Sequence, residues 1–190
     1  MIRLCEVQLL LQSLKSKLYR NHKMKQNTTL HFFSGKMAAG KSTLAKQLVQ
    51  EENAILLTED EWLKELYENE IQTLPDYLKY SSRLKTVIKK HVISLLSNGI
   101  TVVMDFPGNT KQQRAWFREI FTEANVTHML HYVEKSDEVC KQQLRSRSEK
   151  LPHGAAFTSE KEFEMITKYF QAPQNDENFN TKIYKEKSFL

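Results

Sequence analysis

A glycine-containing stretch near the start of the chain combines residue types that suit phosphate chemistry. Gly35 and Gly40 are followed by Lys41, Ser42 and Thr43 with the spacing G-x-x-x-x-G-K-[ST]. Glycines at these positions allow backbone N–H groups to surround an anion at a helix N-terminus, where the dipole favours negative charge. The lysine can neutralise β- and γ-phosphates, and the serine hydroxyl can hold Mg²⁺. The stretch therefore predicts a binding site for a nucleoside triphosphate. Its residues are Gly35, Lys36, Met37, Ala38, Ala39, Gly40, Lys41, Ser42 and Thr43.

Two carboxylates follow short apolar runs of strand length. Asp60 comes soon after the run at residues 54–58, and Asp105 ends the run at residues 100–104. Because ligands of open α/β sheets bind outside the carboxyl ends of the strands, we expect both residues in the site. Asp60 is the candidate base that orients an acceptor hydroxyl toward the γ-phosphate, or else an acid that only complements a helix dipole. Asp105 is the candidate Mg²⁺ ligand together with Ser42, or a substrate contact.

Five other side chains are candidates for the same crevice. Asn109 and Arg114 lie in a loop and the first turn of the next helix, and we expect them to bind substrate. Arg145 and Arg147 lie late in a helix that leads into an irregular segment, which is typical of a lid that closes over phosphates. A solvated basic helix end is the alternative for this pair. Arg83 is a candidate contact for an anionic group of the acceptor, or a surface residue.

The elements that would position these residues alternate between strand and helix from residue 30 onward. Leu44, Ala45, Leu48 and Val49 recur at helical spacing behind the glycine stretch. The pattern predicts a three-layer α/β fold, with a mostly parallel sheet of about five strands and helices on both faces. The expected strands are residues 30–34, 54–58, 100–106, 127–133 and 181–185. Thr58, Thr110 and Ser159 each precede a helix with an acidic or amide side chain three residues later, which predicts capping boxes.

Composition narrows the functional classes. The 190 residues carry a net charge of +5, without a dense basic stripe interleaved with aromatic residues, so we expect no nucleic-acid partner. No apolar run approaches the roughly 20 residues that cross a bilayer, so we expect no membrane association. Cys5 and Cys140 are far apart and outside metal-ligand spacing, which indicates a reducing compartment and a cytoplasmic location. The oligomeric state stays open.

Residues 1–29 are interpreted as an N-terminal helical extension, and residues 30–190 as one nucleotide-binding domain. Leu4, Val7, Leu11, Leu14 and Leu18 follow a heptad-like seam, which predicts an amphipathic helix over residues 3–20. This helix either packs on the domain or on a partner, or forms an upstream extension with Met24 opening the compact domain.

With these residues assembled, the chain resembles the P-loop kinases of the zeta-toxin and AAA-like ATP-binding group. These kinases are relatives of chloramphenicol phosphotransferase, polynucleotide kinase, and the shikimate and gluconate kinases. The resemblance covers about residues 30–185. The segments that carry it are residues 35–43, residues 58–62, residues 105–110 with Arg114, the pair Arg145 and Arg147, and Pro173 with residues 177–180.

The resemblance implies a P-loop NTPase fold and phosphorylation of a small-molecule hydroxyl by ATP and Mg²⁺. It implies Asp60 as the base, Lys41 and Ser42 at the phosphates and the metal, and the lid arginines at the γ-phosphate. In polynucleotide kinases an arginine follows the catalytic aspartate within one helical turn; Leu63 has that position here, which disfavours a nucleic-acid acceptor. The alternatives are an ATP-binding regulatory module without acceptor phosphorylation, and a nucleic-acid end kinase.

Overall fold

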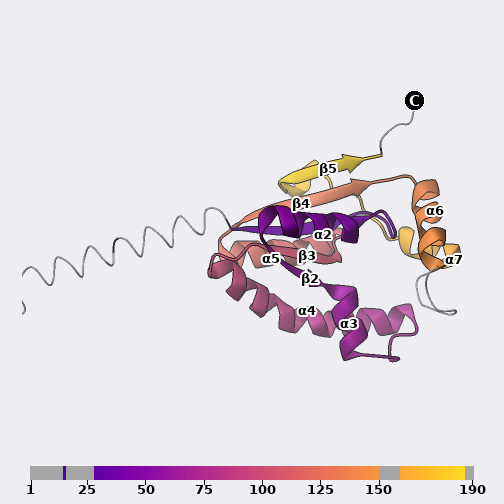
Figure 1. Cartoon of the computed structure of the whole chain (residues 1–190), viewed down its shortest axis with the longest axis horizontal. Helices are drawn as coiled ribbons and strands as arrows, with labels where there is room; N and C mark the ends of the chain where they lie inside the picture. The colour runs from indigo at the N-terminus through magenta and orange to yellow at the C-terminus, as the bar shows by residue number, and fades with distance from the viewer. Residues whose placement is uncertain (1–14, 16–27, 150–158, 187–190) are drawn as a thin grey trace, which may run out of the picture.

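A five-stranded parallel sheet forms the centre of the molecule (Figure 1). The structure is a computed structural model that describes residue 15, residues 28–149 and residues 159–186. The strands lie in the order β2-β3-β1-β4-β5, and each neighbouring pair is parallel. Their bounds are β1 Thr29–Ser34, β2 Ile55–Thr58, β3 Val102–Pro107, β4 Thr127–Glu134 and β5 Thr181–Lys185. The predicted P-loop NTPase-type α/β fold is confirmed, whereas the predicted N-terminal helix lies outside the described residues except for residue 15.

Helices cover both faces of this sheet. Their bounds are α2 Lys41–Glu52, α3 Glu59–Leu66, α4 Leu74–Ser97, α5 Lys111–Ala124, α6 Asp137–Ser148 and α7 Glu160–Thr167, followed by the short 3₁₀ helix η1 Asn175–Glu177. On one face Phe32 and Met104 pack with Ile88 of α4 and Phe117 of α5. On the other face Phe33 packs with residues of α2. The sheet is thus the middle of three layers, because alternate side chains of β1 and β3 enter different apolar cores. In the part of the chain that the structure describes, no helix is both long and apolar enough to span a membrane.

Local side-chain caps set where most of the helices begin. Capping boxes open α4 at Thr73, α5 at Thr110 and α7 at Ser159, each with a side chain that accepts a backbone N–H of the first turn. The boxes predicted at Thr110 and Ser159 are therefore confirmed. The box predicted at Thr58 is wrong, since its side chain makes no cap hydrogen bond. Thr58 is the last residue of β2, and its partner in the sheet is Asp105.

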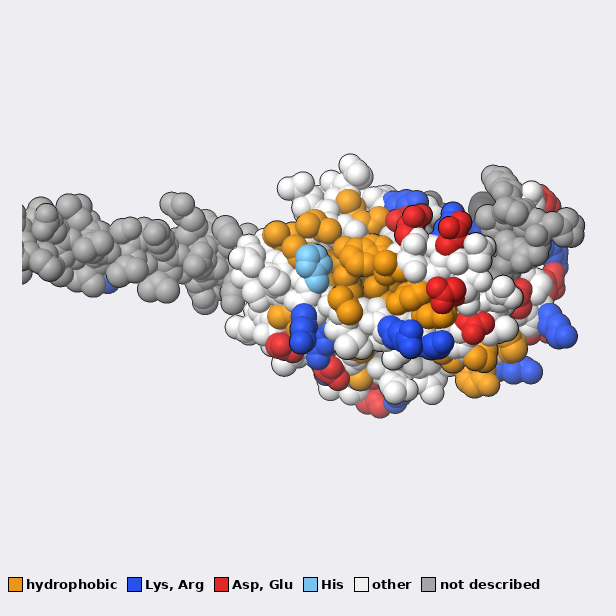
Figure 2. Space-filling view, turned by 90° about the horizontal axis from the view of Figure 1, so that it is seen from below, with side chains coloured by type: hydrophobic (Ala, Val, Ile, Leu, Met, Phe, Trp, Pro, Cys, Tyr) orange, Lys and Arg blue, Asp and Glu red, His pale blue; other side chains and the backbone are white. Residues whose placement is uncertain are grey.

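The edge strand β2 and the two helices that follow it leave apolar side chains exposed. Figure 2 shows such side chains gathered, among charged groups, on the face seen from below. The exposed large apolar residues of these elements are Ile55, Leu66, Leu78 and Val87. Of these residues only Ile55 belongs to the sheet, whereas Leu66 lies on α3 and Leu78 and Val87 lie on α4.

Two histidines form a buried polar chain across the sheet. Nδ1 of His31 in β1 lies 2.9 Å from Nε2 of His131 in β4, and Nδ1 of His131 lies 2.9 Å from the Tyr184 hydroxyl in β5. Burial lowers the pKa of His131 to about 3, with a further contribution from His31. Burial also lowers the pKa of His31, so both rings are neutral at neutral pH.

The pair predicts a specific loss of stability in acid. Unfolded histidines take up protons below about pH 6.5, whereas the folded His131 stays neutral down to about pH 3, so the free energy of unfolding falls across this window. His131 contributes a slope of about 1.4 kcal/mol per pH unit within this window. In His131→Phe, urea denaturation at a series of pH values across this window should show an unfolding free energy that depends less steeply on pH, by the slope that one bound proton contributes. An unchanged slope would exclude His131 as a source of the acid sensitivity.

Candidate functional site

The loop between β1 and α2 contains two positions that suit only glycine, one because of space and one because of backbone conformation. A Cβ on Gly35 would lie 2.7 Å from the carbonyl oxygen of Val133 in β4. Gly40 has a φ of 100°, a conformation that residues with a Cβ rarely adopt. The glycines of the sequence motif are therefore required by the geometry, and backbone N–H groups line the start of α2 as an anion site demands.

Lys41, the first residue of α2, directs its ammonium group into this loop. Nζ donates hydrogen bonds to the carbonyl oxygens of Gly35 at 2.7 Å and Lys36 at 2.8 Å. Burial lowers the pKa of Lys41 to about 8, an effect that the carboxylates of Asp105 and Asp60 oppose. The ammonium is thus held among carbonyl oxygens where a triphosphate would supply full negative charges.

Ser42 and Asp105 form the oxygen-rich part of the site. Burial raises the pKa of the Asp105 carboxyl group, and the neighbouring Ser42 side chain partly offsets this effect. A hydroxyl and a carboxylate fit Mg²⁺, which binds few protein ligands and keeps several waters or phosphate oxygens. The described residues contain no cluster of three or more histidine, cysteine or acidic side chains able to hold a metal.

Asp60 lies in the first turn of α3, directly beyond the end of β2. Burial is the main cause that raises the pKa of Asp60, followed by the negative charges of Glu59 and Asp105. The positive charges of Arg147 and Lys41 act in the opposite direction. The structure thus brings together four charged residues that the sequence had placed in the site: Lys41, Asp60, Asp105 and Arg147. Their catalytic roles stay predictions.

Two of the other predicted arginines, Arg145 and Arg83, have different surroundings. Nε of Arg145 lies 2.5 Å from Oε1 of Glu160 in α7, and its side chain is 64% exposed. Arg83 of α4 is exposed and lies over the Tyr80 ring, with 5.7 Å between its guanidinium carbon and the ring centroid. Neither is among the charges that act most strongly on Lys41 or Asp60. Arg147 is therefore the arginine of α6 that belongs to the charged cluster.

Asn109 contacts the glycine loop itself. Its Oδ1 accepts a hydrogen bond from the backbone N–H of Gly35 at 3.0 Å. Its own N–H donates to Oε1 of Gln113 at 2.8 Å, within the cap of α5. Asn109 was predicted as a substrate contact, and the structure places it in hydrogen-bond contact with the first glycine of the loop. It fixes the loop between β1 and α2 relative to the end of β3.

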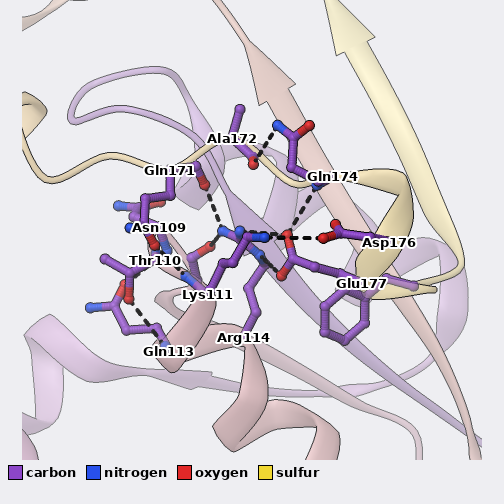
Figure 3. A network of polar contacts seen from close by, with 12 residues as sticks. Asn109, Thr110, Lys111, Gln113, Arg114, Gln171, Ala172, Gln174, Asp176 and Glu177 are labelled. Atoms are coloured by element: carbon purple, nitrogen blue, oxygen red, sulfur yellow. Dashed lines mark hydrogen bonds and ion pairs between the residues drawn. The ribbon is translucent and has the colours of Figure 1, made fainter.

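The prediction that Arg114 binds substrate is corrected by its burial. Its side chain is fully buried, and two of its nitrogens donate to the carboxylate of Glu177 at 2.8 and 2.7 Å. A third nitrogen donates to the carbonyl oxygens of Gly108 at 3.0 Å and Gln171 at 2.8 Å (Figure 3). With its donors used in this way, Arg114 ties α5 to the chain around η1 and cannot face a ligand.

The sequence patterns did not single out Glu59. Glu59 is fully buried. Its carboxylate accepts hydrogen bonds from the Tyr77 hydroxyl and from Ser81 Oγ, the latter at 2.8 Å, and Lys85 Nζ lies 3.4 Å away. Tyr77, Ser81 and Lys85 are spaced by four residues on α4, and this polar stripe was the available signal. Glu59 thereby connects α3, and with it Asp60, to α4.

Comparison with known families agrees with this geometry. Residues 30–173 match the AAA_33 family, described as an AAA domain. The chain belongs to this family. No curated protein matches the sequence.

Solved structures share the same architecture at low sequence identity. A candidate kinase from Chloroflexus aurantiacus is similar with a TM-score of 0.67 and 16% identity, covering 84% of this chain and 89% of that one. A sugar kinase from Janibacter has a TM-score of 0.60 and 13% identity, covering 83% and 85%. The APS kinase CysC of Mycobacterium tuberculosis, solved with AMPPNP and APS, has a TM-score of 0.54 and 17% identity, covering 85% and 90%. At these identities the likeness shows that the chain shares the fold of these proteins.

The buried ion pair of Arg114 predicts a large effect on stability. Arg114→Met should lower the free energy of unfolding by about 3–5 kcal/mol, because Glu177 would keep a charge without its main partner. Lys111→Met is the matched control, because Lys111 lies on the same helix as Arg114 and pairs with Asp176 at 3.2 Å, but its side chain is 53% exposed. This control substitution should have little effect on stability. Urea denaturation of both variants measures the difference. Similar losses in both would contradict the structural role of Arg114.

Proposed function

We propose that the protein is an ATP-dependent kinase that transfers the γ-phosphoryl group of ATP to a hydroxyl of a small-molecule acceptor. The observation that carries this proposal is the position of Asp60. A carboxylate beyond the end of β2 shares one electrostatic cluster with Lys41 of the glycine loop. A module that only binds or hydrolyses ATP has no need for an acceptor-side carboxylate at this place.

The glycine loop would bind the phosphates of ATP. Backbone N–H groups at the start of α2 would surround them, and Lys41 would exchange its carbonyl partners for β- and γ-phosphate oxygens. Ser42 and Asp105 would hold Mg²⁺, which neutralises phosphate charge when bound. Arg147, on α6, would stabilise the charge that develops on the transferred group.

Asp60 would orient the acceptor hydroxyl and accept its proton. Phosphoryl transfer needs in-line positioning and charge neutralisation more than covalent chemistry, so one well-placed carboxylate suffices. Burial raises the pKa of Asp60, with contributions from Glu59 and Asp105, and this brings the group nearer to the range of an effective base at neutral pH. Lys41 and Arg147 oppose the shift and keep the carboxylate available in its charged form.

Several observations favour a small acceptor over a nucleic acid. Leu63, at the position where polynucleotide kinases carry an arginine, is buried in the apolar core. The cations that act most strongly on Asp60 are Arg147 and Lys41, which the phosphates of ATP would occupy. A sugar kinase and an APS kinase share the fold. We place the activity in the cytoplasm, in keeping with the free thiol of Cys140.

Removal of the loop lysine should abolish tight ATP binding. Lys41→Ala removes the main positive charge of the site, so affinity for ATP should fall about 10–150-fold, the usual worth of hydrogen bonds to charged groups. Isothermal titration calorimetry measures this directly. Lys90→Ala, an exposed position on α4, is the control. A folded Lys41→Ala variant with the affinity of the parent would contradict the proposed phosphate site.

The Asp60 carboxylate gives the test of kinase chemistry. Asp60→Asn should bind ATP nearly as the parent does, because the glycine loop is unchanged. Its kcat should fall about 10²–10⁴-fold, the usual worth of general base catalysis. ADP release in the presence of a library of hydroxyl metabolites measures turnover and identifies the acceptor. Glu65→Gln, on the exposed side of the same helix, is the matched control.

The alternative role of Asp60 gives a different result. If Asp60 only complemented the dipole of α3, the variant would lose about 0.3–1 kcal/mol of stability and keep its turnover. Thermal melts and rates on one purified variant separate the two roles. Parental turnover would remove the main support for a kinase.

A further inference from the structure

The segment between β4 and α6 places a second lysine against the glycine loop. Lys135 directly follows β4, and its Nζ lies 3.7 Å from the position that a Cβ would take on Gly40. Gly40 is the residue that leads into α2, where backbone N–H groups point at an anion site. The ammonium group of Lys135 therefore lies beside the loop that would bind the phosphates. In the sheet order, β4 lies on the opposite side of β1 from β2, the strand that Asp60 follows.

Lys135 is held there by a neutral partner. With its amide oriented to satisfy both neighbours, Gln143 of α6 donates to the carbonyl oxygen of Ala38 at 2.6 Å and accepts from Lys135 Nζ at 3.0 Å. Ala38 is the one residue with a Cβ in the loop whose φ is positive, at 59°. Gln143 thus supports a strained turn of the loop and the ammonium group at the same time.

The surroundings of Lys135 differ from those of the neighbouring lysines. Lys36 forms an ion pair with Asp137, and Lys141 lies 2.6 Å from a carboxylate oxygen of Glu164. Among the residues that the structure describes, no carboxylate lies within ion-pair distance of Lys135. A partly buried cation whose charge no carboxylate neutralises can interact strongly with an anionic ligand.

We propose that Lys135 is a further phosphate-binding residue, and that Gln143 is the positioning residue that holds it against the glycine loop. This inference rests on the binding of a nucleoside triphosphate in the proposed function, but not on phosphoryl transfer. Lys41 approaches the phosphates from inside the loop, whereas Lys135 approaches from the β4 side. The phosphate chain is then contacted by cations from two separate segments of the chain.

Calorimetric titration of the full chain with ATP, and separately with inorganic tripolyphosphate, tests the assignment. Lys135→Met should weaken the binding of both ligands by about tenfold or more, as expected for the loss of a charged hydrogen bond. Lys135→Arg should keep most of the affinity. Lys141→Met is the matched control, because it removes a lysine of α6 that is already paired, and should leave both affinities unchanged. Gln143→Leu should cause a smaller loss than Lys135→Met.

Several results would overturn the proposal. Equal affinities of parent and Lys135→Met would exclude a phosphate contact, and a loss for ATP alone would indicate a contact with the nucleoside. If Lys135→Met does not fold, a Gln143→Leu variant with parental affinity for both ligands would overturn it. The kinase proposal fails separately: a parent chain that binds both ligands but phosphorylates no acceptor refutes phosphoryl transfer and leaves this test intact. A parent that binds neither ligand refutes both.

Discussion

The position of β1 between β3 and β4 is the constraint on which the site depends. Parallel strands end at the same edge of the sheet, so three chain segments must leave that edge side by side. Gly35 meets Val133 of β4 so closely that a Cβ would lie 2.7 Å from its carbonyl oxygen. Gly108, after β3, lies equally close to Phe33, with a Cβ position 2.6 Å from its oxygen. Two glycines thus allow backbone to pack on backbone, which leaves the N-terminus of α2 open to a ligand.

Convergence of the strands also concentrates charge where water is partly excluded. Burial lowers the pKa of Lys41 to about 8 and raises the pKa of Asp60 and of Asp105. In each case neighbouring opposite charges offset only part of this effect of burial on the pKa. Arg114 and Glu177 are different, because their charges satisfy each other through two hydrogen bonds. Incompletely compensated charges beside an anion-binding loop are typical of a functional site rather than of a structural ion pair.

Two buried polar clusters connect the helices that surround the carboxyl ends of the strands. Glu59 joins α3 to α4 through Tyr77 and Ser81. Arg114 joins α5 to η1 and to the chain before it (Figure 3). Buried ion pairs contribute little net stability compared with apolar packing, but a missing partner is costly, so they favour one arrangement of the segments over others. Each cluster lies next to a residue of the site: Glu59 precedes Asp60, and Gly108, which Arg114 holds, precedes Asn109.

The amino-acid sequence by itself determined the features whose causes are local. The glycine loop was recognisable because its chemistry depends on backbone conformation at fixed spacing, and the five strands and most helix starts follow from short-range patterns and caps. The box at Thr58 failed because the end of β2 is fixed by its pairing with β3 rather than by the next helix. Whether a charged side chain faces the crevice or the interior was decided only by tertiary structure. Arg114 and Glu59 have partners 63 and 22 residues away, and no local pattern contains those contacts.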